Sequence, residues 1–545
     1  MSITSAAEAT AATNPARGGK HSRWRRAEGA VRARPSRSDV RAWAAWVLGV
    51  SILGAAWTVP GTIAGATLGW IAALWIATAI RSGRGYLTAY LGGVVLHLFG
   101  FHWIFRTVMI HGGFGPITAG AVFGLFVASA ALQFVGVAVI GRSLPPIFDL
   151  LAIRSATSMV LAELLMPRLF PWHAGHTQMA FTPVAQLAGI GGAMAITFLM
   201  FWVAEAVVRA ASGERRRVLL LPVGALALTI AYGLVMIARY DAPRGEPQEV
   251  VIVQGAVAEE GDWDLPTARR YAYQLYDLSR EAEHRGSLIV WPEGAIPAYL
   301  PAMIGTIGDP PQLPWSDSGA AYLVGGYAFT PDEDRYNAAF AVYPNGEVPV
   351  PYFKQVLIPF GEYMPFASIF PGLNALNDKG GVFAAGTSDK VFDYPMTRPD
   401  GTTYTLRASP LICYEDLLPS LARQSTRDGA QLLVNLTSDN WFGRSLAPWQ
   451  HHLIASFRAI ETRRYLVRST TTGLSAVVDP LGRTVASLPL FTKGTAKCTV
   501  RLLSDGSPYA DWFGDGPWWG LLVGAVGLGA VHRLRVRRMA TLTAS

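Results

Sequence analysis

The sequence predicts an α-helical transmembrane bundle of eight spans that carries one α/β domain outside the membrane. Only 15% of the 545 residues are charged and 51% are hydrophobic, whereas roughly 25% of an average soluble domain is charged. Apolar runs long enough to cross about 30 Å of hydrocarbon follow one another in series along the chain. Between the last two runs, short apolar stretches alternate with amphipathic ones, as in an α/β domain. This composition excludes a disordered chain, and two cysteines are too few for a disulfide framework.

The chain begins with a polar, basic segment, residues 1–41, which we expect to be a cytoplasmic tail. This segment lacks the apolar core and cleavage site of a signal peptide. Residues 42–240 contain seven apolar runs that we predict to be membrane spans, and residues 515–545 contain an eighth, shorter run followed by basic residues. The predicted spans cover residues 42–59, 61–80, 86–103, 117–140, 148–166, 184–208, 218–237 and 518–531.

The basic residues predict the orientation of these spans. Arginine is concentrated at both termini and in every second loop, for example at residues 215–217, whereas the opposite short loops hold little. The positive-inside rule therefore predicts cytoplasmic termini and a periplasmic domain at residues 241–514. Residues 247–512 hold 21 Lys and Arg against 28 Asp and Glu, so the overall charge of +8 combines −7 there with +15 elsewhere. This basic excess indicates membrane orientation, and no nucleic-acid partner is expected.

The periplasmic segment is long enough for one α/β domain with its own core. Its β-branched runs are apolar on both faces, which favours sheets packed under helices. We predict strands at 250–253, 287–291, 322–325, 338–343, 408–412, 432–436 and 475–478, and helices at 267–284 and 448–463.

Three polar residues lie at strand ends or in the loops that follow: Glu293, Lys354 and Cys413. Strand ends are where α/β folds present catalytic groups. A cysteine nucleophile needs a base for its proton, and its acyl intermediate needs a cation or N–H donors at the oxyanion. Glu, Lys and Cys supply these roles. Taken singly, each also has an ordinary explanation, as a turn carboxylate, a solvated lysine or a buried small residue.

The motifs around these residues resemble the nitrilase superfamily and, within it, its membrane-embedded branch, the apolipoprotein N-acyltransferases. The family pattern W-P-E-x-A-[IL]-P is matched at residues 291–297. The pattern K-x-x-L-[VI]-P-F-G-E-[FY] is matched at 354–363, and C-Y-E at 413–415. Because the motifs occur in order and the eight-span topology agrees, the resemblance covers nearly the whole chain after the basic tail.

Two further blocks are similar to the family, residues 253–255 with Trp263 downstream and residues 440–470. The chain differs from the pattern at Gly294, where Ser or Thr is usual, and at residues 437–440, where the common pattern is S/T-N-D-A. These differences affect loop hydrogen bonding and leave the three proposed catalytic positions unchanged.

The resemblance implies a nitrilase-like αββα sandwich and a catalytic group of Glu293, Lys354 and Cys413. It also implies four further residues that activity requires: Trp263, Glu362, Tyr414 and Glu415. In physical terms, a carboxylate close to the lysine keeps its ammonium in place and charged. The alternative for Glu415 is that it caps a helix starting at Leu417, because acidic residues favour the first turn.

The expected reaction moves an acyl chain from a phospholipid, through a cysteine thioester, to the N-terminal amine of a diacylglyceryl-cysteine lipoprotein. The resemblance places it at the outer face of the bacterial cytoplasmic membrane, with membrane lipids as further partners. We expect a monomer without metal or cofactor. Two alternatives stay open: a membrane-anchored amidase that uses water as acceptor, and a transporter or scaffold with an inactive nitrilase-like domain.

Ionisable residues within predicted spans are costly, so Asp149, Arg154 and Glu163 are candidates for a role. Asp149 and Arg154 either pair or snorkel to the interface, or they help to bind substrate. The predicted helix at 448–463 carries His451 and His452, which point in different directions and do not form a joint metal site.

Two other expectations concern the periplasmic segment. Cys498 has no acid or base nearby in the sequence and is predicted to be a strand residue. Residues 366–376 are apolar and rich in turn formers, and they follow Glu362 closely. We predict that they form a mobile loop that covers the pocket and touches the membrane surface.

Overall fold

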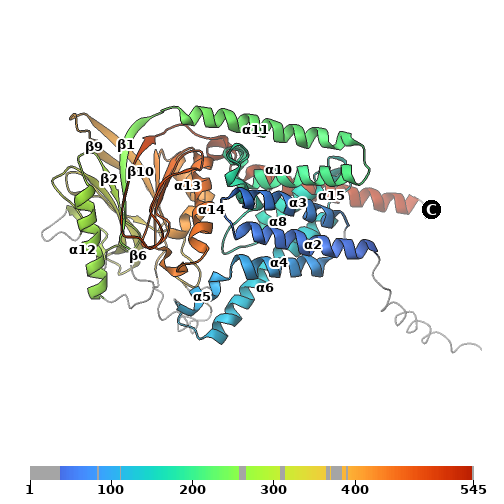
Figure 1. The fold of residues 1–545 in the computed structure, drawn as a ribbon, viewed down its shortest axis with the longest axis horizontal. Helices are drawn as coiled ribbons and strands as arrows, with labels where there is room; N and C mark the ends of the chain where they lie inside the picture. The colour runs from blue at the N-terminus through green and yellow to red at the C-terminus, as the bar shows by residue number, and fades with distance from the viewer. Residues whose placement is uncertain are drawn as a thin grey trace, which may run out of the picture.

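The computed structural model shows a helical bundle joined to a two-sheet domain, with helices α13 (Pro419–Arg427) and α14 (Ala447–Thr462) between them (Figure 1). The described residues are 37–82, 85–110, 112–256, 265–296, 298–306, 313–363, 369, 383–387 and 391–542. Trp263 and, except for Ile369, the predicted loop at 366–376 lie outside the described residues.

The bundle contains long apolar helices that match most of the predicted spans. Its helices are α2 (Arg37–Trp57), α3 (Ile63–Ser82), α4 (Tyr86–Gly100), α5 (Trp103–Ile110), α6 (Pro116–Ser143), α7 (Ile147–Leu150), α8 (Arg154–Leu165), α9 (Thr182–Ala185), α10 (Ala188–Ala211), α11 (Leu220–Asp241) and α15 (Gly516–Leu542). Among the described residues, five helices are long and apolar enough to cross a membrane: those at 39–57, 63–82, 116–143, 188–211 and 216–241. Helices α4 and α5 meet at a bend of 58° and count together as a sixth.

The fifth predicted span, residues 148–166, is wrong as one continuous helix, because the chain turns within it. Between α7 and α8, Ala152 adopts a positive φ of 56°. The Arg154 guanidinium holds this turn by donating to both carboxylate oxygens of Asp149, at 2.5 and 2.6 Å, and to the Leu144 carbonyl at 2.9 Å. Polar groups at membrane depth must be satisfied internally. The two charged side chains therefore pair with each other and close the end of α6.

Glu163, the third ionisable residue of that predicted span, is buried at the other end of α8. Its carboxylate accepts hydrogen bonds from the Ala174 amide at 2.8 Å and the Thr197 hydroxyl at 3.4 Å. It also lies 2.9 Å from Nδ1 of His173. These contacts satisfy the carboxylate within the protein and attach the chain that follows α8 to α10.

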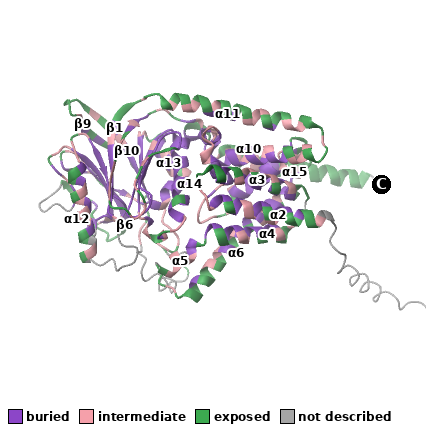
Figure 2. Cartoon of the chain, in the orientation of Figure 1, coloured by how far each residue is buried: buried purple, intermediate pink, exposed green. Residues whose placement is uncertain are grey.

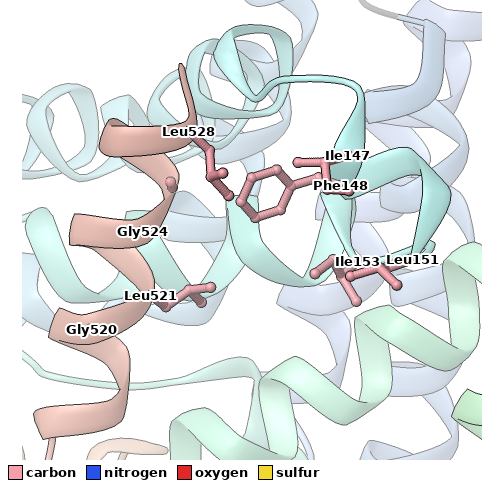
Figure 3. Close-up of a pocket in the computed structure, with 9 residues that line it drawn as sticks. Ile147, Phe148, Leu151, Ile153, Gly520, Leu521, Gly524 and Leu528 are labelled. Atoms are coloured by element: carbon pink, nitrogen blue, oxygen red, sulfur yellow. The ribbon is translucent and has the colours of Figure 1, made fainter. Parts of the chain in front are cut away.

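Helix α15 lies along the outside of the bundle, where most of its residues are exposed (Figure 2). At 27 residues it is long enough to span a membrane, but its apolar run ends at His532. An apolar cavity of about 280 Å³ is lined by residues of α15, of α7 and of the turn that follows α7 (Figure 3). A Cβ at Gly520 or Gly524 would meet no heavy atom within 4 Å. The two glycines thus leave the cavity open beside Phe148.

The strands of the domain form two large sheets and one small sheet. The first has the order β15 (Gly494–Leu502), β1 (Glu246–Gln254), β2 (Leu288–Val290), β5 (Ala321–Phe329), β6 (Arg335–Val342), β8 (Tyr352–Phe353), with β3 (Tyr299–Pro301) also paired to β5. The second has the order β14 (Thr484–Ser487), β13 (Ala476–Val478), β12 (Tyr465–Thr470), β11 (Leu432–Thr437), β10 (Thr403–Ile412), β9 (Phe392–Thr397). A two-stranded sheet pairs β4 (Gly305–Thr306) with β7 (Glu347–Val348). The runs β1–β2–β5 and β10–β11–β12 are parallel.

The two large sheets pack face to face, with helices on their outer faces. Side chains alternate along a strand, and Val250 of β1 and Val434 of β11 share the core between the sheets. Their neighbours point outward: Val251 packs toward α12 (Leu265–Ala282), and Leu433 toward α13 and α14. Both faces of each sheet are therefore apolar. The predicted αββα sandwich is confirmed.

Helix α14 joins this domain to the bundle. On one side, Ala455 and Ala459 pack against the second sheet. On the other side, Phe457 and Ile460 share a buried cluster with Trp57 of α2. Because α14 is buried along both faces, the two-sheet domain is held directly against the end of the bundle (Figure 2).

Candidate active site

The ends of three strands bring Glu293, Lys354 and Cys413 together. Glu293 follows β2, Lys354 directly follows β8, and Cys413 directly follows β10, so the group combines both sheets. All three side chains are buried, with residue exposures of 8%, 0% and 6%. Cys413 has a φ of 51°, a conformation that non-glycine residues rarely adopt and that is concentrated at functional sites.

A second carboxylate and an amide complete the polar group. Lys354 Nζ lies 2.8 Å from Glu362 Oε1 and 3.7 Å from Glu293 Oε1. Asn337 Nδ2 donates to both carboxylates, at 2.7 Å to Glu293 and 3.0 Å to Glu362. The backbone N–H of Ser438 donates to the other oxygen of Glu293 at 2.8 Å. These donors hold the Glu293 carboxylate in one orientation.

Burial and the neighbouring charges shift the pKa values of Glu293, Cys413 and Lys354. Burial raises the pKa of Glu293, and Lys354 opposes this effect. Burial, followed by the charge of Glu293, raises the pKa of the Cys413 thiol well above its usual value. Burial alone lowers the pKa of Lys354, but Glu362 and Glu293 outweigh it and the pKa lies above its usual value. The shifts favour a protonated Cys413 thiol, hydrogen-bonded to Glu293, beside a charged Lys354 ammonium.

Glu415 connects the cysteine loop to the lysine loop. Its buried carboxylate accepts hydrogen bonds from the backbone N–H groups of Ile412 (2.7 Å), Gln355 (2.7 Å) and Val356 (3.2 Å) and from the Tyr352 hydroxyl (2.9 Å). Glu415 caps the short 3-10 helix Cys413–Leu417. The alternative that it caps a helix beginning at Leu417 is wrong, because the next helix, α13, begins at Pro419.

Replacing Glu415 by glutamine is expected to lower the free energy of unfolding by about 1–3 kcal/mol, because an amide NH₂ leaves buried N–H donors without an acceptor. Thermal unfolding of the purified protein in detergent measures this loss. The matched control is Glu347→Gln on the exposed edge of β7, which is expected to leave the melting temperature unchanged. Equal melting temperatures for the two variants would contradict the assignment.

The site borders the membrane bundle. Tyr414, the residue after Cys413, donates its hydroxyl proton to the Leu169 carbonyl at 2.7 Å, in the segment after α8. The Phe442 ring packs on Trp103 of α5, with ring centroids 4.9 Å apart. Tyr414 and Phe442 therefore both touch the helical bundle directly, and Tyr414 links the residue next to the thiol to it.

The other candidates from the sequence lie in different surroundings. His451 faces two buried carboxylates, Asp416 at 2.8 Å and Asp439 at 3.0 Å. His452 turns away and bonds a threonine hydroxyl of β14 at 2.8 Å. Cys498 lies in β15, so its assignment to a strand is confirmed.

Sequence reasoning missed two groups that hold Glu293. Asn337 was the easier to find, because it is a lone amide in the strand segment Arg335–Val342 and Asn is disfavoured in strands. Ser438 contributes its backbone N–H, which no residue type encodes.

Two family profiles match consecutive parts of the chain. The apolipoprotein N-acyltransferase N-terminal domain matches residues 49–206, and the carbon-nitrogen hydrolase family matches residues 270–504. The first range covers most of the apolar helices, and the second contains Glu293, Lys354 and Cys413.

A similarity over nearly the full length decides the family. The apolipoprotein N-acyltransferase of Geobacter metallireducens is 32% identical over 498 residues, which covers 85% of this chain and 90% of that protein. This chain belongs to the apolipoprotein N-acyltransferase family. Another member, from Methylococcus capsulatus, is 32% identical over 464 residues, covering 83% of this chain and 88% of that protein. Nit3 of Saccharomyces cerevisiae, a nitrilase-superfamily structure, covers 47% of this chain and 90% of its own at 17% identity and a TM-score of 0.34, too distant to add to this assignment.

Proposed function

We propose that this chain transfers an acyl group from a phospholipid to the N-terminal amine of a diacylglyceryl-cysteine lipoprotein. Membership of the family supports N-acyl transfer to lipoproteins. The observation that carries the chemistry is the buried group of Glu293, Lys354 and Cys413, which Tyr414 attaches to the bundle. A lipid ester cannot diffuse into water, so a thiol beside the membrane helices suits such a donor.

In the first half-reaction, Glu293 takes the proton of the Cys413 thiol, and the thiolate attacks the ester carbonyl of the phospholipid. Lys354 and the backbone N–H of Tyr414 stabilise the tetrahedral oxyanion. The C–O bond then breaks, and Glu293 returns the proton to the departing lysophospholipid alkoxide. The acyl group remains on the cysteine as a thioester.

In the second half-reaction, the α-amine of the lipoprotein attacks the thioester carbonyl. Glu293 accepts a proton from the amine, and Lys354 again stabilises the oxyanion. The C–S bond breaks, Cys413 recovers its proton, and the product is an amide. Glu362, 2.8 Å from Lys354 Nζ, keeps the ammonium charged and in position through both steps.

The proposed topology has eight spans, cytoplasmic termini and a periplasmic catalytic domain. The arginine distribution supports the orientation. Counting the bent α4–α5 pair as the third span, and the α7–α8 segment and α15 as the fifth and eighth, returns both termini to one side. Trp263 is proposed to support activity on the strength of the resemblance alone.

The rate of thioester formation is expected to fall at acidic pH, and this acid limb should lie at a higher pH than the ordinary pKa of a glutamate would give. The base acts only when ionised, and burial raises the pKa of Glu293, so activity falls as pH drops through that raised value. Replacing Glu362 by glutamine removes a negative charge that contributes to the raised pKa, and the limb is expected to move to lower pH. Single-turnover rates between pH 4 and 8 measure the limb. A limb unmoved in Glu362→Gln would contradict Glu293 as the base.

A substrate comparison distinguishes acyl transfer from its competitors. Purified protein is incubated with acyl-labelled phospholipid and a diacylated lipopeptide, and in parallel with small amides. Label in an amide at the lipopeptide N-terminus is the expected result. Hydrolysis of small amides alone would indicate a membrane-anchored amidase, and no turnover of either would indicate an inactive scaffold; both outcomes reject the proposal.

A further inference from the structure

A buried histidine lies between two carboxylates immediately behind the active site. His451 donates from Nε2 to Asp416 Oδ1 at 2.8 Å and from Nδ1 to Asp439 Oδ1 at 3.0 Å, so both nitrogens carry a proton. His451, Asp416 and Asp439 are each at most 2% exposed. Arg468 of β12 completes the cluster, with Nε 3.3 Å from Asp416 Oδ2. Two cations thus face two anions out of contact with water.

Each carboxylate of this cluster belongs to a loop that carries part of the active site. Asp416 lies in the short helix that begins at Cys413. Asp439 follows Ser438, whose N–H donates to Glu293. His451 therefore hydrogen-bonds both the loop of the nucleophile and the loop that holds the base.

The neighbour of this histidine on α14 binds the membrane bundle. Gln450 accepts a hydrogen bond from Trp103 Nε1 at 2.9 Å and donates to the backbone carbonyls of Trp57 at 3.0 Å and Gly100 at 2.8 Å. One end of α14 thus contacts the bundle through one residue and the active-site loops through the next.

The charges of the cluster depend on one another. Burial alone lowers the pKa of His451, but Asp416 and Asp439 outweigh burial and Arg468, and the pKa rises to about 9. His452, the remaining titratable neighbour, has its pKa lowered to about 3 by burial and the charges of Arg468 and His451, so it is neutral at pH 7. Without the imidazolium, two buried carboxylates would share one guanidinium.

We propose that His451 is a positioning residue for the acyl transfer: as a cation bonded to Asp416 and Asp439, it sets the spacing between the thiol of Cys413 and its base. This inference rests on the proposed function. It assigns to an adjacent pair of histidines two separate roles, since only the first of them reaches the active-site loops.

The test compares His451→Gln with His452→Gln, the neighbouring histidine on the same helix. Thioester formation on Cys413 is followed by mass spectrometry with excess phospholipid. We expect His451→Gln to slow this step about 10- to 100-fold at saturating donor with little change in KM, because small displacements of reacting groups cost such factors. His452→Gln is expected to react at a rate close to that of the unmodified protein. Equal rates for both variants and the unmodified protein would overturn the proposal.

A pH series and a double variant separate charge from simple packing. The pKa of His451 is raised in the folded state, so its stabilisation is present below about pH 6.5 and is lost as pH rises through about 9. The melting-temperature gap between unmodified protein and His451→Gln should therefore shrink at high pH. Adding Asp439→Asn to His451→Gln should recover stability, because it removes the uncompensated charge. A melting-temperature gap that is constant with pH, or stability losses that add up in the double variant, would show that His451 contributes only by packing. If the unmodified protein forms no thioester, the proposed function fails instead.

Discussion

Replacing Cys413 by alanine is expected to reduce acyl transfer at least about 10⁴-fold, because the variant has no nucleophile to hold the acyl group. The side chain sits at the end of β10, beside Glu293 and Lys354, and no water or hydroxyl in the proposed mechanism replaces it. Transfer of labelled acyl groups from phospholipid to a diacylated lipopeptide measures the loss.

The second cysteine provides the control. Cys498 lies half-buried in β15, away from any of the groups that activate the first thiol. Cys498→Ala is expected to retain full activity and full labelling. Activity that survives in Cys413→Ala, or that disappears in Cys498→Ala, would contradict the assignment of the nucleophile.

Lys354→Met is expected to cost both activity and stability. The lysine is fully buried, and its ammonium faces the carboxylates of Glu362 at 2.8 Å and Glu293 at 3.7 Å. Removing a donor to the oxyanion costs about 10³-fold in rate. Leaving a buried carboxylate unpaired lowers the free energy of unfolding by about 3–5 kcal/mol. Acyl-transfer assays and denaturant unfolding of the same preparation measure the two effects.

A double variant separates these two effects. In Lys354→Met with Glu362→Gln, one uncompensated charge is removed, so part of the lost stability should return. Activity should stay low, because the cation that stabilises the oxyanion is still missing. Recovery of activity together with stability would show that the lysine serves the fold alone.

The long helices of the bundle could be predicted from the lengths of the apolar runs, except that the fifth run contains a turn. Apolar runs predict long helices because each must satisfy its own backbone in the membrane. Pairing of Asp149 with Arg154 was one of the predicted alternatives, but the apolar pattern does not reveal the turn inside the fifth run that this pair holds. Similarly, β12 was not predicted, because Arg468 interrupts its apolar pattern; in the structure the arginine is buried facing Asp416 and Asp439.

The three catalytic candidates could be predicted from the sequence, but the groups that hydrogen-bond Glu293 could not. Strand-end positions and motifs identify Glu293, Lys354 and Cys413, and the structure brings these residues together. The backbone N–H of Ser438 and the amide of Asn337 act on Glu293 across segments far apart in the chain, so local patterns carry little sign of them. The sequence argued against a joint metal site at the two adjacent histidines of α14, but it did not reveal the carboxylate partners of His451, because Asp416 and Asp439 are distant in sequence.

The most direct test of the central claim is to trap the acyl-enzyme. Purified protein is incubated with phospholipid alone, digested, and examined by mass spectrometry for an acyl group on the peptide that contains Cys413. We predict a thioester on this residue that hydroxylamine removes and that disappears, with formation of an amide, when diacylated lipopeptide is added. An acyl group on another residue, or transfer to lipopeptide without any acyl-cysteine, would contradict the account.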